Sequence, residues 1–341
     1  MDRNLTAGIS IGDFNGIGIE IILKTFQDSR IIEDVTPIIY GKKELFDQYI
    51  DLIPELNTSF KIINSAKEIN FKKINLVNIS SKSYACVPGQ INISAGELAY
   101  NSLKCVTSDL SKGLIDVLIT APINKKNIQS EEFNFPGHTE YLTALSNANE
   151  SLMFMIDQGL RVGLATNHVE IKKISSVLSL DLILNKLSLM NNSLKVDFNI
   201  QTPKIAVLGL NPHSGDLGLL GQEEIDIISP AISKAKESGI YAWGPFPADG
   251  FFGNGIYKNF DGVLAMYHDQ GLIPFKTISN NKGVNFTAGL PIVRTSPDHG
   301  TGMDISGKGI ADESSFRNAV FLAKDIFRNR YEAKKRKEKR S

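Results

Sequence analysis

The fold class is indicated by residues 6–20, which read Thr6-Ala-Gly-Ile-Ser-Ile-Gly-Asp-Phe-Asn-Gly-Ile-Gly-Ile-Glu20. The first six residues are a short apolar run of strand type, and the apolar segment after Gly18 has the character of a helix. Parallel strands joined by crossover helices produce this succession of strand, glycine turn and helix. The stretch therefore predicts an α/β protein, and its glycine loop either holds an anion or is only a tight turn.

Further apolar runs, with helix-like segments between them, extend this pattern along the 341-residue chain. The strand candidates are residues 6–11, 36–40, 74–79, 117–121, 161–166, 204–210 and 262–266. None of them alternates cleanly between apolar and polar residues, which is typical of parallel strands buried on both faces. Between them, Ser94 and Glu97 form a capping-box pattern at the start of a predicted helix. A second predicted helix starts near Glu223 and is kinked or divided at Pro230.

The length exceeds what one hydrophobic core usually organises, so we expect two α/β/α domains with mostly parallel sheets and an active-site cleft between them. The 37 Lys and Arg residues balance 37 Asp and Glu residues, which leaves no overall field to hold nucleic acid or an anionic membrane. No apolar stretch approaches the roughly 20 residues of a membrane span. Cys86 and Cys105 are too few for a disulfide scaffold. We therefore expect a cytoplasmic enzyme that acts on small molecules and binds neither nucleic acid nor membranes.

Three of the five histidines share one position relative to an apolar run. His168, His213 and His268 each follow such a run closely. Because parallel strands deliver the loops after them to one edge of a sheet, these three imidazoles can converge. Three protein ligands plus an open position is the layout of a catalytic metal site, and histidine is its commonest ligand. The pattern predicts one divalent-metal site; the alternative is that each histidine is an ordinary loop or helix-cap residue.

Other polar residues lie in apolar or glycine-rich surroundings. Residues 298–312 contain repeated glycines that permit close backbone approach to a ligand, and Asp304 among them can accept hydrogen bonds from ribose hydroxyls. A flexible polar loop is the alternative. Arg294 has a position from which an arginine can grip a phosphate or carboxylate with two hydrogen bonds. Asp249 can orient a histidine ligand or add a ligand to the metal. The alternative is that Asp249 is an ordinary residue of a surface turn.

Several motifs, taken in order along the chain, resemble those of the 4-hydroxythreonine-4-phosphate dehydrogenase family. They are Gly12-Asp-Phe-Asn-Gly-Ile-Gly18, Thr120-Ala-Pro-Ile-Asn-Lys125, Pro136-Gly-His-Thr-Glu140, Leu210-Asn-Pro-His213, Gly244-Pro-Phe-Pro-Ala-Asp249, Ala265-Met-Tyr-His-Asp-Gln-Gly271, Gly283-Val-Asn285 and Gly289-Leu-Pro-Ile-Val-Arg-Thr-Ser296. The match covers nearly the whole chain up to about Arg328. Residues 298–312 also look like the nucleotide-binding loop of the isocitrate and isopropylmalate dehydrogenase superfamily.

The resemblance implies NAD(P)-dependent oxidation of 4-phosphooxy-L-threonine at C3, giving a β-keto acid that decarboxylates to 3-amino-2-oxopropyl phosphate in pyridoxal 5′-phosphate (vitamin B6) biosynthesis. It implies NAD or NADP and one divalent metal per active site, Zn, Mg, Co or Mn. The matching metal ligands are His168, His213 and His268. The matching substrate contacts are His138, Thr139, Lys276, Asn285 and Arg294. For the nucleotide we expect Gly300, Thr301 and Asp304, and for the general base Asp249 or Lys276.

The resemblance also implies an isocitrate/isopropylmalate dehydrogenase-like fold and a homodimer. In that dimer we expect shared active sites, with His168 and His213 from one chain and His268 from its partner. Residues 1–127 and 280–330 are expected to form the domain with the nucleotide-binding loop, and residues 128–279 the domain with the metal ligands and dimer contacts. Residues 331–341 are expected to be a basic disordered tail.

Three departures from the family pattern leave the substrate open. Asp13-Phe-Asn15 stands where relatives often have an acidic residue followed by Pro-Ala, Asn167 stands where Thr is usual, and Gly250 stands where Thr is usual. One alternative is a paralogous dehydrogenase of D-threonate or D-erythronate 4-phosphate. Others are a metal-dependent hydrolase that uses the same three histidines, and a metabolite-binding protein without catalytic activity.

Overall fold

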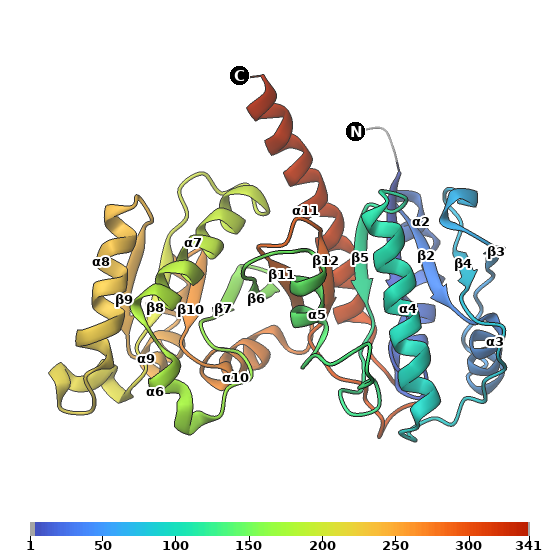
Figure 1. Cartoon of the computed structure of the whole chain (residues 1–341), viewed down its shortest axis with the longest axis horizontal. Coiled ribbons are helices and arrows are strands. Elements are labelled where there is room, and N and C mark those ends of the chain that lie inside the picture. The colour runs from blue at the N-terminus through green and yellow to red at the C-terminus, as the bar shows by residue number, and fades with distance from the viewer. Residues whose placement is uncertain (1–3, 340–341) are drawn as a thin grey trace. The chain divides into compact units, whose positions relative to one another are not determined.

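The computed structural model describes residues 4–339. The chain folds into two compact units (Figure 1). Unit 1 is Met1–Ser146 with Pro291–Phe327, and unit 2 is Asn147–Leu290 with Arg328–Ser341. The chain crosses between the units after residues 146, 290 and 327, and the first two of these borders lie later than the borders that we expected, at residues 127 and 280. Over residues 4–339, every helix is too short or too polar to span a membrane.

Unit 1 is built on six strands whose neighbours all pair in parallel. Their order is β3 (Lys61–Ile63), β4 (Asn75–Asn78), β2 (Val35–Gly41), β1 (Leu5–Ser10), β5 (Val117–Thr120) and β12 (Arg294–Pro297). Its helices are α1 (Gly18–Gln27), α2 (Ser29–Asp34), α3 (Lys43–Leu52), the 3-10 turn η1 (Ala66–Glu68), α4 (Ile93–Ser111), α5 (His138–Leu145) and the first part of α11 (Ser314–Glu338). The chain leaves β1 toward β2 on one side and later returns to β5 on the other. Ligands of parallel sheets bind at the carboxyl edge beside such a reversal.

Unit 2 is built on a mixed sheet. The strand order is β11 (Val284–Ala288), β6 (Leu152–Asp157), β7 (Leu160–Leu164), β10 (Gly262–Ala265), β8 (Ile205–Leu208) and β9 (Ala242–Phe246). β6 pairs antiparallel with both of its neighbours, whereas β7, β10, β8 and β9 are parallel. Its helical segments are η2 (Ile171–Lys173), α6 (Ile174–Val177), α7 (Leu180–Val196), η3 (Pro212–Gly218), η4 (Glu224–Ile228), α8 (Ser229–Glu237), α9 (Ala248–Gly253), η5 (Ile256–Asn259) and α10 (His268–Ser279).

The α/β prediction is confirmed, and each of the seven predicted apolar runs overlaps a strand. The strands that we did not predict are β3, β6, β9, β11 and β12. β3 is short and half exposed, and Pro245 interrupts the apolar pattern of β9. The break near Pro230 is real, because a π-helical segment ends at Ile228 and Pro230 lies in the first turn of α8.

Two local predictions differ from the structure. Helix α4 is capped by Asn92 and not by Ser94: the Asn92 side chain accepts a hydrogen bond from the amide of Ala95 at 2.9 Å. Tyr331 to Glu338, expected in a disordered tail, are the last turns of α11. Residues with high helix propensity continue the helix there, and Arg336 donates a hydrogen bond to Asn199 at 2.9 Å. Arg340 and Ser341 lie outside the described residues.

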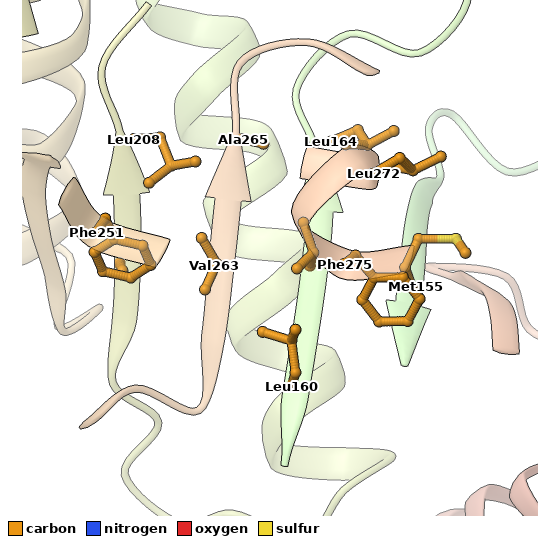
Figure 2. Close-up of a cluster of buried hydrophobic side chains, with 11 residues drawn as sticks. Met155, Leu160, Leu164, Leu208, Phe251, Val263, Ala265, Leu272 and Phe275 are labelled. Atoms are coloured by element: carbon orange, nitrogen blue, oxygen red, sulfur yellow. The ribbon is translucent and has the colours of Figure 1, made fainter. Parts of the chain in front are cut away.

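The core of unit 2 lies between the parallel strands and α10 (Figure 2). Val263 and Ala265 of β10 face the same side as Phe275 of α10, and α7 lies behind the strands. Gly271 lets α10 approach closely, because a Cβ there would stand 2.9 Å from side-chain atoms of both Leu164 and Val162. This close packing fixes the position of α10 on the sheet, and therefore the position of His268, its first residue.

We expect Phe275→Ala to lower the free energy of unfolding of unit 2 by about 3–5 kcal/mol, because it leaves a cavity in a close-packed core. Phe275 is 0% exposed, whereas Ile273 on the same helix is 63% exposed. The matched control Ile273→Ala should change stability by less than about 0.5 kcal/mol. Urea unfolding followed by the fluorescence of Trp243 in β9 measures both variants. Equal losses in the two variants would contradict this description of the core.

Candidate functional site

The three histidines predicted to bind metal follow three adjacent parallel strands of unit 2. β10 pairs with β7 on one side and β8 on the other. His168 lies after β7, His213 lies in η3 after β8, and His268 is the first residue of α10 after β10. The loops that carry them therefore leave the sheet at the same carboxyl edge.

His168 and His268 come together within one chain. Their ring centroids are 5.8 Å apart and their planes are inclined by 36°. A pocket of about 210 Å³ lies beside them and is lined also by Ile171, Ile174 and Tyr267. Two imidazoles that bind one zinc ion through nitrogens at about 2.1 Å have centroids roughly 5–6 Å apart. The pair therefore fits two ligands of one divalent ion.

Asp269 orients the His268 ring. Its Oδ1 is 2.8 Å from Nδ1 of His268. A carboxylate that accepts a hydrogen bond from one ring nitrogen fixes the tautomer and directs the other nitrogen to a ligand. The His268 side chain thus presents Nε2 for binding, and Asp269 is the supporting residue beside it.

His213 does not join this pair. Across residues 4–339, no three His, Cys, Asp or Glu side chains are close enough to hold a metal ion together. Within one chain, His168 thus lies near His268 and His213 does not join them, whereas the resemblance implies a metal site with His168 and His213 from the same chain; the sharing itself stays a prediction. His213 instead opens a turn in which every residue to Leu217 has a positive φ. A complete three-histidine site is not present within the described part of a single chain.

Unit 1 holds a cluster of basic side chains around Arg294, the first residue of β12. Arg294 is 2% exposed, and its Nη2 and Nε donate to Oγ1 of Thr120 at 2.7 and 3.2 Å. Burial lowers the pKa of Arg294 from its usual range to about 10, and the carboxylate of Glu140 opposes this shift. Thr120 ends β5, at the edge where parallel sheets bind ligands. The arginine is therefore placed to meet an anion.

His138 belongs to the same cluster. Burial, together with the positive charges of Arg294 and Lys125, holds the pKa of His138 well below its usual value of 6.5. Its Nε2 is buried and has no hydrogen-bond partner among residues 4–339. A neutral imidazole with an unsatisfied buried nitrogen needs a polar partner, which a ligand can supply. Thr139, the other residue predicted here, follows it in the first turn of α5.

Lys125 was not among the predicted site residues. It ends the motif Thr120-Ala-Pro-Ile-Asn-Lys125, and its charge acts on His138. A Cβ built on Gly137 would lie 3.9 Å from Cε of Lys125, which places the lysine beside the start of α5. The signal available in the sequence was the position of Lys125 in the loop after the carboxyl end of a predicted strand, residues 117–121.

The two glycine-rich stretches of unit 1 pack against each other. The amide of Ile17 donates to the carbonyl of Thr301 at 2.8 Å, and a Cβ on Gly16 would be 2.5 Å from that oxygen. Asp13 is buried and accepts a hydrogen bond from Asn127 at 2.7 Å, and burial raises the pKa of Asp13. The first glycine loop is thus a tight structural turn that supports residues 298–312.

Helix α1 supports the far end of the same loop. The buried carboxylate of Glu20 accepts from the amide of Ala311 at 2.9 Å and pairs with Lys24 at 2.9 Å. Lys24 in turn donates to the carbonyls of Gly309 and Ala311 at 2.8 and 2.7 Å. Residues 298–312 are therefore an anchored loop, and not the flexible polar loop that the sequence left open.

The other predicted residues occupy separate elements. Asp249 lies in the first turn of α9 and Lys276 in the last turn of α10, and both are exposed. Asn285 lies in β11, and its buried Oδ1 has no hydrogen-bond partner in the described part of the chain. Gly300 faces open space, and Asp304 is exposed.

Known proteins resemble this chain over most of its length. Residues 33–323 match the family model described as pyridoxal phosphate biosynthetic protein PdxA. A 4-hydroxythreonine-4-phosphate dehydrogenase of Bacteroides thetaiotaomicron is 48% identical over 98% of this chain and 92% of its own. A candidate D-threonate 4-phosphate dehydrogenase of Oceanobacillus iheyensis is 35% identical over 96% of this chain and 99% of its own.

A solved structure gives the same assignment. The crystal structure of 4-hydroxythreonine-4-phosphate dehydrogenase from Klebsiella pneumoniae matches with a TM-score of 0.83 and 32% sequence identity. The match covers 96% of this chain and 98% of that one. Sequence and fold agree over the whole length, so the chain belongs to the family of the pyridoxal phosphate biosynthetic protein PdxA.

Proposed function

We propose that this chain oxidises 4-phosphooxy-L-threonine at C3 with NAD or NADP, as a dehydrogenase of pyridoxal 5′-phosphate biosynthesis. The near full-length likeness to the Bacteroides enzyme is the observation that carries the proposal. A bound nicotinamide would accept the hydride from C3, and a base of the protein would take the hydroxyl proton. The β-keto acid product then loses carbon dioxide to give 3-amino-2-oxopropyl phosphate. The protein's part is to position both reactants and to balance their charges.

We assign the anionic groups of the substrate to the basic cluster of unit 1. Arg294 presents a planar donor set that suits phosphate or carboxylate, and its burial strengthens each bond that it makes. His138 is neutral at pH 7, so it contributes a hydrogen bond without adding a third charge beside Arg294 and Lys125. Thr139 completes this set. By resemblance, we also assign Lys276 and Asn285 to the substrate.

We propose that His168 and His268 of one chain and His213 of a second copy bind one divalent ion, Zn, Mg, Co or Mn. The proposal is supported by the closeness of His168 and His268 within one chain and by the absence of His213 from that pair in the described residues. Leu217 and Leu219, close to His213, are 98% and 78% exposed, as expected of residues that a second copy covers. A twofold homodimer would contain two identical shared sites. A bound ion supplies Lewis-acid polarisation of the substrate oxygens.

We assign the nucleotide to residues 298–312. Gly300 has open space around it, so a cofactor can approach the backbone there. The carbonyl of Thr301 is already used by Ile17, so the amide and the hydroxyl of Thr301 are the groups proposed for the cofactor. Asp304 is proposed to accept hydrogen bonds from ribose hydroxyls. A loop anchored at both ends loses little entropy when the cofactor binds.

Two residues are proposed for the proton transfer, and one alternative is kept for the substrate. Asp249 and Lys276 are both candidates for the general base.

The Oceanobacillus relative favours D-threonate 4-phosphate as the second candidate substrate, with D-erythronate 4-phosphate as its close analogue. Gly250 stands beside Asp249, so it is the departure from the family pattern that we connect with selectivity between these substrates. The cytoplasmic location stays a prediction.

The reaction is tested with the purified chain, either nicotinamide cofactor and added Zn²⁺, Mg²⁺, Co²⁺ or Mn²⁺. We expect kcat/KM for 4-phosphooxy-L-threonine to exceed that for the threonate and erythronate phosphates by at least about tenfold, because a site built for the C2 amine leaves polar groups unpaired with a hydroxyl. Absorbance of the reduced nicotinamide measures the rate. A reversed preference supports the alternative substrate, and turnover without any nucleotide would indicate a hydrolase.

The shared metal site is tested by mixing inactive chains. His168→Ala and His213→Ala chains, unfolded and refolded together, should regain roughly a quarter of wild-type activity, because half of the dimers are mixed and each has one intact site. The control mixture of His168→Ala and His268→Ala should regain none, since both residues come from the same chain. Recovery in the control mixture alone would instead support the pairing of His168 with His213.

The protonation state of His138 is tested by stability against pH. Its lowered pKa means that the unfolded chain takes up a proton below pH 6.5 while the folded chain does not. The stabilising contribution is thus complete above 6.5 and is lost as the pH falls below it, by at most about 1.4 kcal/mol per pH unit. We expect His138→Gln to flatten the fall in unfolding free energy between about pH 6.5 and 5.5. Urea unfolding of both proteins at several pH values measures it, and parallel curves would contradict it.

A further inference from the structure

The turn that begins at His213 is held in a conformation that its residues do not favour. The φ angles from His213 to Leu217 are 52, 52, 80, 43 and 55°. Only the third of these residues is glycine. A left-handed conformation costs about 1–2 kcal/mol for each residue with a side chain. Such strain persists only where the surroundings impose it, and it concentrates at functional positions.

Glu224 is the side chain that meets this turn from the protein interior. It is 3% exposed, and its Oε1 accepts hydrogen bonds from the amides of Leu210 and Asn211, each at 2.7 Å. Its Oε2 accepts from Nδ2 of Asn211 at 2.9 Å. The same oxygen would lie 2.7 Å from a Cβ on Gly215, in the middle of the turn. One buried carboxylate thus fixes the chain before the turn and packs against the turn itself, through charge-assisted hydrogen bonds.

The same network reaches the loops of the other two histidines. Nδ2 of Asn211 also donates to Glu223 at 2.8 Å, and Glu223 accepts from Ser175 in α6, which follows His168. On the other side, Gln270 in α10 donates to the carbonyl of Gly209 at 2.5 Å and accepts from the amide of Met266 at 2.7 Å. Side chains that follow His168 and His268 are therefore bonded to the segment that carries His213.

We propose that Glu224 is a positioning residue that holds the left-handed turn and thereby sets the direction in which His213 is presented. A turn that relaxed to ordinary φ values would direct the imidazole elsewhere, because the sign of φ decides the side on which Cβ lies. Glu224 acts through the backbone and not as a metal ligand. The consequence for metal binding rests on the proposed role of His213.

The test compares Glu224→Gln and Asn211→Ala with the control Asp226→Asn, whose exposed carboxylate lies in the same helical segment. Glu224→Gln keeps the size but removes the charge, and Asn211→Ala removes only the amide link to both glutamates. In the metal-free protein, hydrogen exchange of residues 209–222 should become at least about tenfold faster in both variants and stay unchanged in the control. The zinc dissociation constant should rise about 10–100-fold in the same two variants.

Exchange of the turn in Glu224→Gln at the wild-type rate would overturn the proposal. Suppose instead that His213→Ala lowers zinc affinity, and that Glu224→Gln exchanges faster but binds zinc as tightly as wild type. That result would also overturn the proposal, because the turn would then have no effect on how His213 is presented. If His213→Ala binds zinc as tightly as wild type, the proposed metal site fails instead, and the exchange rates still decide whether Glu224 holds the turn. If Glu224→Gln does not fold, Glu224→Asp decides instead: its shorter side chain keeps the charge but withdraws the oxygens from the amides of Leu210 and Asn211, so exchange of the turn at the wild-type rate in that variant would overturn the proposal.

Discussion

Parallel pairing of β10 with both β7 and β8 is the constraint on which the histidine site depends. Parallel strands end at one edge, so three loops distant in sequence leave the sheet side by side. The packing of α10 on these strands then places His268 at the start of that helix, next to His168. The core of unit 2 and its chemistry are therefore coupled: whatever moves α10 relative to β7 also changes the distance between the two imidazoles.

In unit 1, different groups lie at the carboxyl edge of the strands. Its strands are all parallel, but the groups that gather there are cationic side chains and an anchored glycine loop. Burial lowers the pKa of Arg294 to about 10. The guanidinium donates to the hydroxyl of Thr120 and feels the carboxylate of Glu140, and it suits the phosphate or carboxylate of a ligand at this edge. The neutral state of His138 limits the positive charge already present.

Predictions from local patterns were accurate where one physical effect dominated. Each short buried apolar run overlaps a strand, because its length and its flanking turn residues favour a strand covered on both faces over a buried helix. Predictions failed where neighbouring residues competed for one role. Asn92 and Ser94 can both cap a helix, and the structure uses Asn92, with Ser94 donating to it at 3.0 Å. The prediction of a disordered tail after Arg330 rests on the charge of that segment alone. The helix propensity of its residues and the hydrogen bond from Arg336 to Asn199 favour a helix instead.

The sequence by itself determined the α/β class, the family and the identity of the candidate residues, because periodicity and motif order are local properties of the chain. Only the tertiary structure decided which histidines meet. The pairing of His168 with His268, the left-handed turn at His213 and the support from Glu224 depend on strand order and on contacts between loops distant in sequence. Nothing in the spacing of the histidines encodes the sign of φ at His213. That sign is imposed by a buried carboxylate that becomes a neighbour only after the chain has folded.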